Sequence, residues 1–388
     1  MKIFWHRILT VAVMFILSAS LCVFLSSYGL PAVLIAAAVS ILMMAWVVFS
    51  QNLISGIMTS DNKLIRFTKK LKKQLGESKK VYIMGHTASD LDSIGASYGL
   101  YYALSGEYDV KMVVNKQNTL ARPLIDFLSF SDKKCRFYDY ADIADEIDET
   151  SLLIVVDTHR PVIMDYRELY ERVDRKIIID HHRRADDFID DTVISYVKST
   201  ASSACEIVTH IIDILGYKKI STVAATALFA GVMLDTKNFI MNTGLNTFSA
   251  AAFLRQNRAD PVLVKKMFSE SVEICKRKYE IVADAELFDN FAFAKTLIED
   301  ECTRIAIAQA ADELLDINGV LASFVMCPYN GQIYISARSF GDVDVQKIMA
   351  KLGGGGHKTA SACQIKTTDF DVADKRLKAA INDYLNRR

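Results

Sequence analysis

One imidazole and two carboxylates stand close together near the first quarter of the chain. The apolar run Val81–Met84 predicts a short buried strand that ends at Gly85, and His86, Asp90 and Asp92 follow within seven residues. Imidazole nitrogen and carboxylate oxygen are common ligands of divalent metal ions. The stretch therefore predicts the beginning of a metal site, whose other ligands must come from elsewhere in the chain.

Three further apolar runs end in an acidic side chain, and a histidine pair follows one of them. These residues are Asp157, Asp180, His181, His182 and Asp235. A single aspartate at a strand end is usually a turn residue or a helix cap. In open α/β sheets, however, functional residues collect at the carboxyl ends of the strands. A set of this size therefore indicates one shared site.

The donor types narrow the choice of metal. The set contains carboxylate and imidazole but no thiolate, which disfavours a structural zinc and favours an octahedral ion, and the histidines favour manganese over magnesium. The candidate ligands are His86, Asp90, Asp92, Asp157, His181 and Asp235. They are too many for one ion that must also accept water and substrate. We therefore expect two ions with one bridging carboxylate.

Alternating strands and helices are predicted to position these residues. The expected strands are Val81–Met84, Val110–Val114, Leu152–Val156 and Lys176–Ile179, and the expected helices are Ser93–Leu104, Ala201–Leu215 and Val223–Leu234. This alternation is typical of an α/β domain with a largely parallel sheet that is covered on both faces.

A helical connector over Pro261–Ala285 is expected to lead into a second, smaller α/β domain. Its expected strands are Phe291–Lys295, Arg304–Ala308, Leu321–Met326 and Gln332–Ala337, with helical segments around Ala311 and Val345. Four glycines, Gly353–Gly356, precede His357 and would let backbone N–H groups approach a phosphate, although a flexible turn is the alternative. Arg338 is the expected side-chain partner of that phosphate.

The first fifty residues are strongly apolar. Two uncharged runs, Ile8–Leu25 and Leu30–Phe49, are joined by the turn Ser26–Gly29. They predict a two-helix transmembrane hairpin, with a cleaved signal peptide or two core helices as alternatives. Basic residues flank the hairpin and none lies within its turn. We therefore expect a multi-pass protein of the cell membrane, with both termini and the catalytic domains in the cytoplasm.

Charge and cysteine content limit the remaining possibilities. The 388-residue chain has 46 basic and 46 acidic residues, so its net charge does not favour long duplex nucleic acid as a partner. Seven scattered cysteines without a C-x-x-C pair predict reduced thiols. The lysine-rich segment 51–79 predicts a basic linker helix, which either lies on anionic lipid headgroups or is solvated.

The ordered motifs resemble those of the DHH phosphoesterase family with its DHH-associated C-terminal domain. The matching motifs are His86-x-x-x-Asp90-x-Asp92, Asp157 at a strand end, Asp180-His181-His182, and the glycine run before His357. With two N-terminal spans, the chain is more narrowly similar to the membrane-bound cyclic-di-AMP phosphodiesterases. Residues 50–79 leave no room for the sensory and degenerate cyclase-like domains of those proteins.

The resemblance implies a role for each candidate residue. His86 and Asp90 would bind one manganese ion, Asp92, His181 and Asp235 the other, and Asp157 would bridge them. Asp180 would orient the histidine pair from behind. The implied catalytic residues are Asp157, His181 and His182, and the implied substrate contacts are His182, Arg338, Gly354, Gly355, Gly356 and His357. The active site would lie in a cleft between the two domains.

The expected organisation has five parts. They are a hairpin at 1–50, a linker helix at 51–79, a DHH catalytic domain at 80–260, a connector at 261–285 and a substrate-binding domain at 286–388. The implied activity is that of a membrane-anchored, manganese-dependent phosphodiesterase that hydrolyses cyclic di-AMP to linear pApA by a two-metal mechanism. The alternatives are an oligoribonuclease acting on pApA and short oligonucleotides, and a membrane receptor that binds the dinucleotide without cleaving it. Expected partners are the cyclic dinucleotide, the lipid bilayer and, in a homodimer, a second copy.

Overall fold

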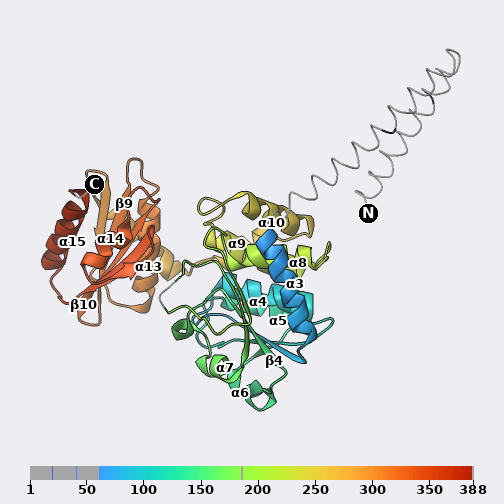
Figure 1. Ribbon diagram of the computed structural model, residues 1–388. Coiled ribbons are helices and arrows are strands. Elements are labelled where there is room, and N and C mark those ends of the chain that lie inside the picture. The colour runs from blue at the N-terminus through green and yellow to red at the C-terminus, as the bar shows by residue number, and fades with distance from the viewer. Residues whose placement is uncertain (1–19, 21–40, 42–60, 185–186, 387–388) are drawn as a thin grey trace. The chain divides into compact units, whose positions relative to one another are not determined.

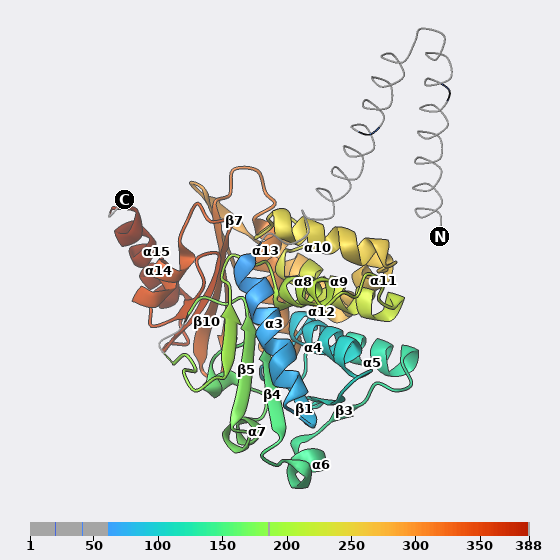
Figure 2. The same cartoon turned by 45° about the vertical axis from the view of Figure 1, so that its right-hand side comes forward.

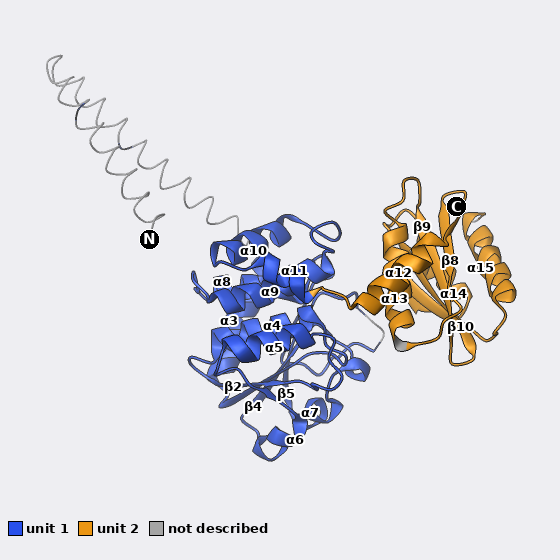
Figure 3. Cartoon of the chain, turned by 180° about the vertical axis from the view of Figure 1, so that it is seen from behind, with its two compact units in different colours: residues 1–267 blue, residues 268–388 orange. Residues whose placement is uncertain are grey.

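The computed structural model describes residues 20, 41, 61–184 and 187–386. The chain divides into two compact units, Met1–Met267 and Phe268–Arg388 (Figure 3). Each unit combines helices with a six-stranded sheet (Figure 1).

The described sheet of the first unit is parallel throughout, as expected. Its strands are β1 (Lys80–Met84), β2 (Asp109–Val113), β3 (Phe137–Tyr138), β4 (Ser151–Val156), β5 (Arg175–Asp180) and β6 (Ile194–Val197). Their order is β3-β2-β1-β4-β5-β6. Because the strands all run the same way, their carboxyl ends meet at one edge of the sheet, with β1, β4 and β5 adjacent.

The central strands are buried on both faces, which explains their continuous apolar sequences. Every residue of β4 is buried, and so is every residue of β1 after Lys80. On one face of the sheet, Tyr82 of β1 and Leu153 of β4 belong to a core cluster that also contains Leu169 of the helix Arg167–Arg172. The helices of this unit are α3 (Asn62–Gly76), α4 (Leu91–Leu104), α5 (Arg122–Ser131), α6 (Tyr140–Ile143), α7 (Arg167–Arg172), α8 (Ala204–Ile214), α9 (Thr222–Asp235), α10 (Leu245–Gln256) and α11 (Pro261–Met267), with short 3-10 turns at Ala144–Glu146 and Pro161–Ile163.

Helices α4, α8 and α9 pack closely against one another (Figure 2). Two glycines permit this contact. A Cβ on Gly95 of α4 would lie 2.5 Å from the Ala227 carbonyl oxygen of α9, and a Cβ on Gly231 of α9 would lie 2.5 Å from Asp92 Oδ1. This close packing places Asp92 at the start of α8 and beside Gly231 of α9.

Helix α3 lies within the segment that was expected to be a basic linker, and it packs on the first unit. Its apolar side chains, including Leu71 and Leu75, are buried, and it contacts β6 and α8. Asp61 caps its N-terminus by accepting hydrogen bonds from the N–H groups of Lys63 and Leu64. Helix α3 is therefore an integral part of this unit.

The second unit has a mixed sheet with helices on both faces. Its elements are α12 (Val272–Ala283), β7 (Glu286–Phe288), β8 (Phe291–Lys295), α13 (Glu301–Leu314), β9 (Ala322–Tyr329), β10 (Gln332–Ser339), α14 (Val345–Lys351), β11 (Gly355–Gly356), β12 (Ala360–Ile365) and α15 (Phe370–Leu385). The strand order is β11-β12-β10-β9-β8-β7, and β8 with β9 is its parallel pair. One core cluster joins the sheet to α14 and α15, and another joins it to α12 and α13.

The expected strand over Arg304–Ala308 is wrong, because this segment lies within α13. Ala306, Ala310 and Leu314 of this helix are fully buried. Their spacing of four residues places them on one face of a helix, which packs on β9 and β10.

The predicted transmembrane part of the fold class, and with it the predicted location in the cell membrane, needs correction. No helix in the described part of the chain is long and apolar enough to cross a membrane. The longest described helix, α15, has 16 residues, whereas a span requires about 20 apolar residues. The predicted spans themselves lie within residues 1–50, outside the described residues apart from positions 20 and 41.

Candidate metal centre

The carboxyl ends of β1, β4 and β5 bring the predicted ligands to one place. His86 and Asp90 lie in the loop that follows β1, Asp157 follows β4 directly, and Asp180 ends β5 just before His181. Three groups of ligand atoms form there, each with all its atoms within 4.8 Å of one another, and one of them is Asp157, Asp180, His181 and His182. The other two groups contain the predicted ligands, namely His86, Asp90 and Asp157 in the first and Asp92, His181 and Asp235 in the second.

Asp157 belongs to the first of these two ligand groups and also faces the second. Its Oδ2 is 3.3 Å from His86 Nε2, and its Oδ1 is 3.3 Å from His181 Nε2. The residue has a left-handed backbone with φ of 61° and is almost completely buried. Its Oδ1 has no hydrogen-bond partner among the described residues. One carboxylate thus faces both imidazoles, which is the arrangement that a bridging ligand requires.

Local hydrogen bonds orient the first group. His86 Nδ1 lies 2.7 Å from the Thr87 carbonyl oxygen. A proton on Nδ1 would be donated to this oxygen, which directs the Nε2 lone pair toward the carboxylates. Asp90 Oδ1 accepts hydrogen bonds from the N–H groups of Asp92 and Ser93, as the cap of α4. A helix start therefore fixes the position of this carboxylate.

Helix ends position the second group. The fully buried Asp92 accepts hydrogen bonds from the N–H groups of Ala204 (2.6 Å) and Cys205 (2.9 Å), at the positive end of α8. Asp235 is the last residue of α9, and its Oδ2 lies 3.1 Å from His181 Nε2. Burial and the nearby Asp157 and Asp235 raise the pKa of Asp92 well above its usual value. The carboxylates in this group therefore repel one another.

The electrostatics of the centre suit bound cations. Burial alone would lower the pKa of His86, but Asp157 and Asp90 outweigh it and raise that pKa to about 11. Burial alone would also lower the pKa of His181, but Asp157 and Asp235 outweigh it and raise that pKa well above its usual value. Burial raises the pKa of Asp157, but the two histidines outweigh it and lower that pKa. Protons on the imidazoles thus balance the carboxylates, and divalent ions would replace these protons.

Asp180 lies behind the histidine pair. Its Oδ1 accepts hydrogen bonds from the N–H groups of His181 (2.7 Å) and His182 (3.1 Å) and lies 2.8 Å from His182 Nδ1. Its Oδ2 contacts His159 Nδ1. Burial raises the pKa of Asp180, but hydrogen bonds from both of these imidazoles outweigh it and lower that pKa. An ionised carboxylate therefore holds the orientation of the pair.

Sequence reasoning did not assign a role to His159. Its ring is buried, lies 5.1 Å from the ring of Phe188, and touches the carboxylate that orients the histidine pair. A signal was present in the spacing, since His159 comes two residues after Asp157, directly beyond a buried strand.

The predicted substrate residues other than His182 lie in the second unit. Arg338 of β10 is opposite Ala360 of β12, and its Nε is 3.3 Å from Asp312 Oδ1. The N–H of Gly354 donates to the Met349 carbonyl oxygen (2.9 Å). A Cβ on Gly354 would overlap the Ala362 carbonyl oxygen.

The remaining residues of this set follow in the same loop and strand. Gly355 and Gly356 form β11 beside β12, and the N–H of His357 donates to the Ala360 carbonyl oxygen (2.7 Å). Internal packing and pairing therefore account for part of the glycine run. Contact of these residues, Arg338 included, with a phosphate stays a prediction.

Two domain families match the chain. The description "DHH family, N-terminal domain" matches residues 80–232, and the description "DHHA1 domain" matches residues 289–383. The first match contains every predicted ligand except Asp235, and the second contains Arg338 and the glycine run.

Relatives of known description support the same assignment. Cyclic-di-AMP phosphodiesterase GdpP of Geobacillus thermodenitrificans is 40% identical over 321 residues, which are 81% of this chain and 49% of the relative. Cyclic-di-AMP phosphodiesterase PdeA of Listeria monocytogenes is 35% identical over the same shares. The chain thus spans about half the length of the curated relatives it matches. A solved exopolyphosphatase-related protein from Bacteroides fragilis shares the fold, with a TM-score of 0.69 and 24% identity over 82% of this chain and 96% of that one.

Proposed function

The chain belongs to the DHH family of phosphoesterases and carries a DHHA1 domain, and from this premise we propose that it is a cyclic-di-AMP phosphodiesterase that forms linear pApA. The observation that carries the proposal is the buried Asp157, whose two oxygens each lie 3.3 Å from a different imidazole. Relatives that are 35% and 40% identical are named for this activity.

In this proposal two manganese ions would be held by the two groups that contain the predicted ligands. His86 and Asp90 would hold one, Asp92, His181 and Asp235 would hold the other, and Asp157 would serve both. When bound, the ions would supply an activated water and would neutralise charge on the phosphodiester. The donor set fits them, because these groups of carboxylate and imidazole contain a buried oxygen without a hydrogen bond.

The chain's own residues complete the chemistry. The side chain of His182 is 40% exposed against 15% for His181, although the same carboxylate holds both residues. We assign His182 to donate a hydrogen bond to a phosphate oxygen of the substrate, where charge grows as the bond to phosphorus forms. Asp180 keeps the ring in the required orientation.

The test compares cyclic di-AMP with pApA as substrates of the full chain in the presence of manganese. We expect cyclic di-AMP to be converted to pApA, and the activity to disappear with a chelator and return with added manganese. Faster turnover of pApA than of cyclic di-AMP would replace the proposed activity with that of an oligoribonuclease. Binding of cyclic di-AMP without cleavage at saturating manganese would make the protein a receptor.

A further inference from the structure

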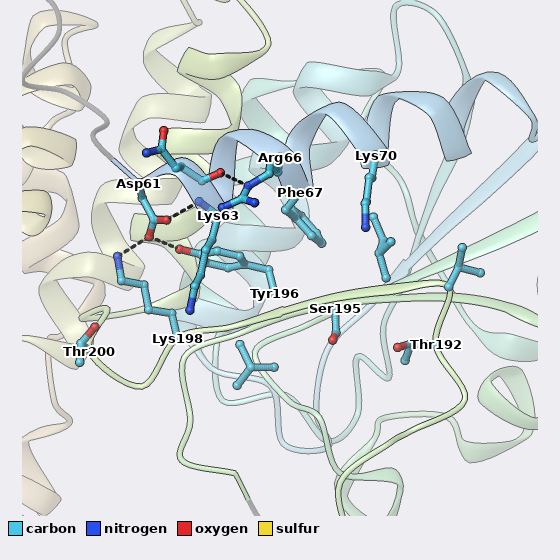
Figure 4. A pocket seen from close by; sticks show the side chains of 14 residues that line it. Asp61, Lys63, Arg66, Phe67, Lys70, Thr192, Ser195, Tyr196, Lys198 and Thr200 are labelled. Carbon is cyan, nitrogen blue, oxygen red and sulfur yellow. Dashed lines mark hydrogen bonds and ion pairs between the residues drawn. The ribbon is translucent and has the colours of Figure 1, made fainter.

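A groove of about 1030 Å³ lies between α3 and β6 (Figure 4). It is lined by residues from the first half of α3 and by every residue from Thr192 to Lys198. None of its described lining residues is a predicted metal ligand. The volume is at the upper limit of the about 300–1,000 Å³ found for small-molecule sites. The groove is therefore not the metal centre itself, although a smaller pocket that shares Ser195 and Val197 with it is also lined by His182, and the volume of the groove suits a larger ligand.

The groove runs along the outer edge of a strand. Successive side chains of a strand point to opposite faces, so a groove that touches every residue from Thr192 to Lys198 must follow the edge itself. Within the described part of the chain, β6 is the last strand of the sheet and pairs with β5. Its outer backbone N–H and C=O groups therefore face the groove.

The wall that α3 contributes is positively charged. Lys63, Arg66 and Lys70 line the groove at positions that share one face of the helix, and Figure 4 shows Lys63 and Lys70 pointing from α3 toward β6. None of these three basic side chains forms an ion pair with a carboxylate in the described part of the chain. The acidic lining residue, Asp61, is already paired with Lys198 Nζ at 2.8 Å. The wall thus carries a net positive charge.

The floor and length of the groove are well defined. The rings of Phe67 and Tyr196, both buried, lie 5.5 Å apart beneath it, and the Tyr196 hydroxyl donates to Asp61 at 2.7 Å. A helix rises about 1.5 Å per residue, so the wall from Asp61 to Lys70 is about 14 Å long. At about 3.3 Å per residue, an extended segment of about four to five residues fits beside it.

We propose that this groove binds an acidic segment of a partner protein in an extended conformation, which adds to β6 as a further strand. An edge strand offers donors and acceptors in alternation, and another peptide backbone satisfies both. Phosphate groups of nucleic acid or lipid only accept hydrogen bonds and would leave the carbonyl groups of β6 unpaired. Acidic side chains at alternate positions of the segment would meet Lys63, Arg66 and Lys70.

The first experiment measures binding to the full chain by fluorescence anisotropy. The probe is a labelled eight-residue peptide in which glutamate alternates with valine, and the comparison peptide has lysine in place of glutamate. We expect the acidic probe alone to bind. The double variant Lys63→Glu/Lys70→Glu should weaken that binding about tenfold, because it reverses two charges that face the groove.

A matched control is available on the same helix. Lys69 and Lys72 are exposed on α3 but do not line the groove. The variant Lys69→Glu/Lys72→Glu changes the total charge by the same amount and should leave the affinity within about twofold. Equal weakening by the two double variants would show a general charge effect and would overturn the proposal.

The second experiment tests the strand pairing without changing the protein. In an extended peptide, alternate N–H groups face the neighbouring strand, so N-methylation of one alternate set should abolish binding while methylation of the other set should not. Bound peptide should also slow hydrogen exchange in residues 192–198. Equal binding of both methylated peptides, or stronger binding of single-stranded RNA or anionic vesicles, would overturn the proposal. If exchange in residues 192–198 is already slow without peptide, β6 pairs with another segment of this chain, and the proposal is overturned. If that slow exchange depends on protein concentration, β6 pairs with a second copy of the chain instead.

Discussion

The metal centre of the first unit differs from the predicted phosphate region of the second unit, which consists of Arg338 and Gly353–His357. The difference lies in how many of the buried polar groups form internal hydrogen bonds. Asp157 Oδ1 is buried without a hydrogen bond to any described residue and has His181 Nε2 at 3.3 Å, whereas the Gly354 N–H donates to the Met349 carbonyl oxygen. An unsatisfied buried group costs about 1–3 kcal/mol. Where other carboxylates and imidazoles surround such a group, as they do at Asp157, the site suits a bound cation, while internal hydrogen bonds account for part of the glycine run.

This contrast separates two kinds of support for the proposed function. The metal centre rests on the geometry of the first unit itself, since carboxylates and imidazoles from several elements come within 4.8 Å. The substrate role of the second unit rests on the resemblance. Changes at the two places should therefore have different consequences, and four variants test this difference.

The largest effect is expected from Asp157→Asn. Asparagine tolerates the left-handed backbone at this position, so the variant should fold, but it loses the charge that faces both imidazoles. We expect the manganese-dependent rate to fall about 10³-fold and calorimetry to show weaker manganese binding. Circular dichroism provides the folding control. A rate within tenfold of the original would show that Asp157 does not bridge the ions.

His159→Phe should have the next largest effect. Phenylalanine keeps the ring contact with Phe188 but cannot hydrogen-bond to Asp180, so the histidine pair loses part of its support. We expect manganese affinity or activity to fall about 10–100-fold, measured by titrating the rate with manganese. The matched control is His210→Phe, at a buried histidine of α8 that contacts the Asn246 carbonyl oxygen. Equal loss in both variants would mean that His159 acts only through general stability.

Gly354→Ala should affect stability more than chemistry. The added Cβ would overlap the Ala362 carbonyl oxygen. We therefore expect the free energy of unfolding of the second unit, measured by urea denaturation, to fall by about 1–3 kcal/mol. Gly355→Ala is the control, because nothing lies within 4 Å of its Cβ position, and it should cost less than about 0.5 kcal/mol. If Gly355→Ala nevertheless lowers the rate, the phosphate role of the loop gains support.

The smallest expected effect is that of Arg338→Ala. If the guanidinium binds a substrate phosphate, KM for cyclic di-AMP should rise about tenfold while hydrolysis of a small artificial phosphodiester stays unchanged. Asp312→Asn removes the ion-pair partner but keeps the guanidinium, and it should leave KM near its original value. A purely structural Arg338 would instead lower Tm in both variants without changing KM.

Local sequence patterns predict the sheet of the first unit well. The expected strands Val81–Met84 and Leu152–Val156 coincide with β1 and β4 to within one residue, because long apolar runs bounded by polar residues are typical of buried parallel strands. The same pattern fails at Arg304–Ala308, where five residues are too few to distinguish a strand from the buried face of a helix.

The types of the metal ligands and their positions at strand ends follow from the chain alone, since they depend on residue identity and on where each apolar run stops. The distances between these ligands cannot be predicted from the chain alone. Asp92 meets the backbone of Ala204 across 112 positions, and His159 meets Asp180 although neither motif predicts the other. Such contacts, like the groove beside β6, arise when distant elements pack together, and local periodicity carries no information about that packing.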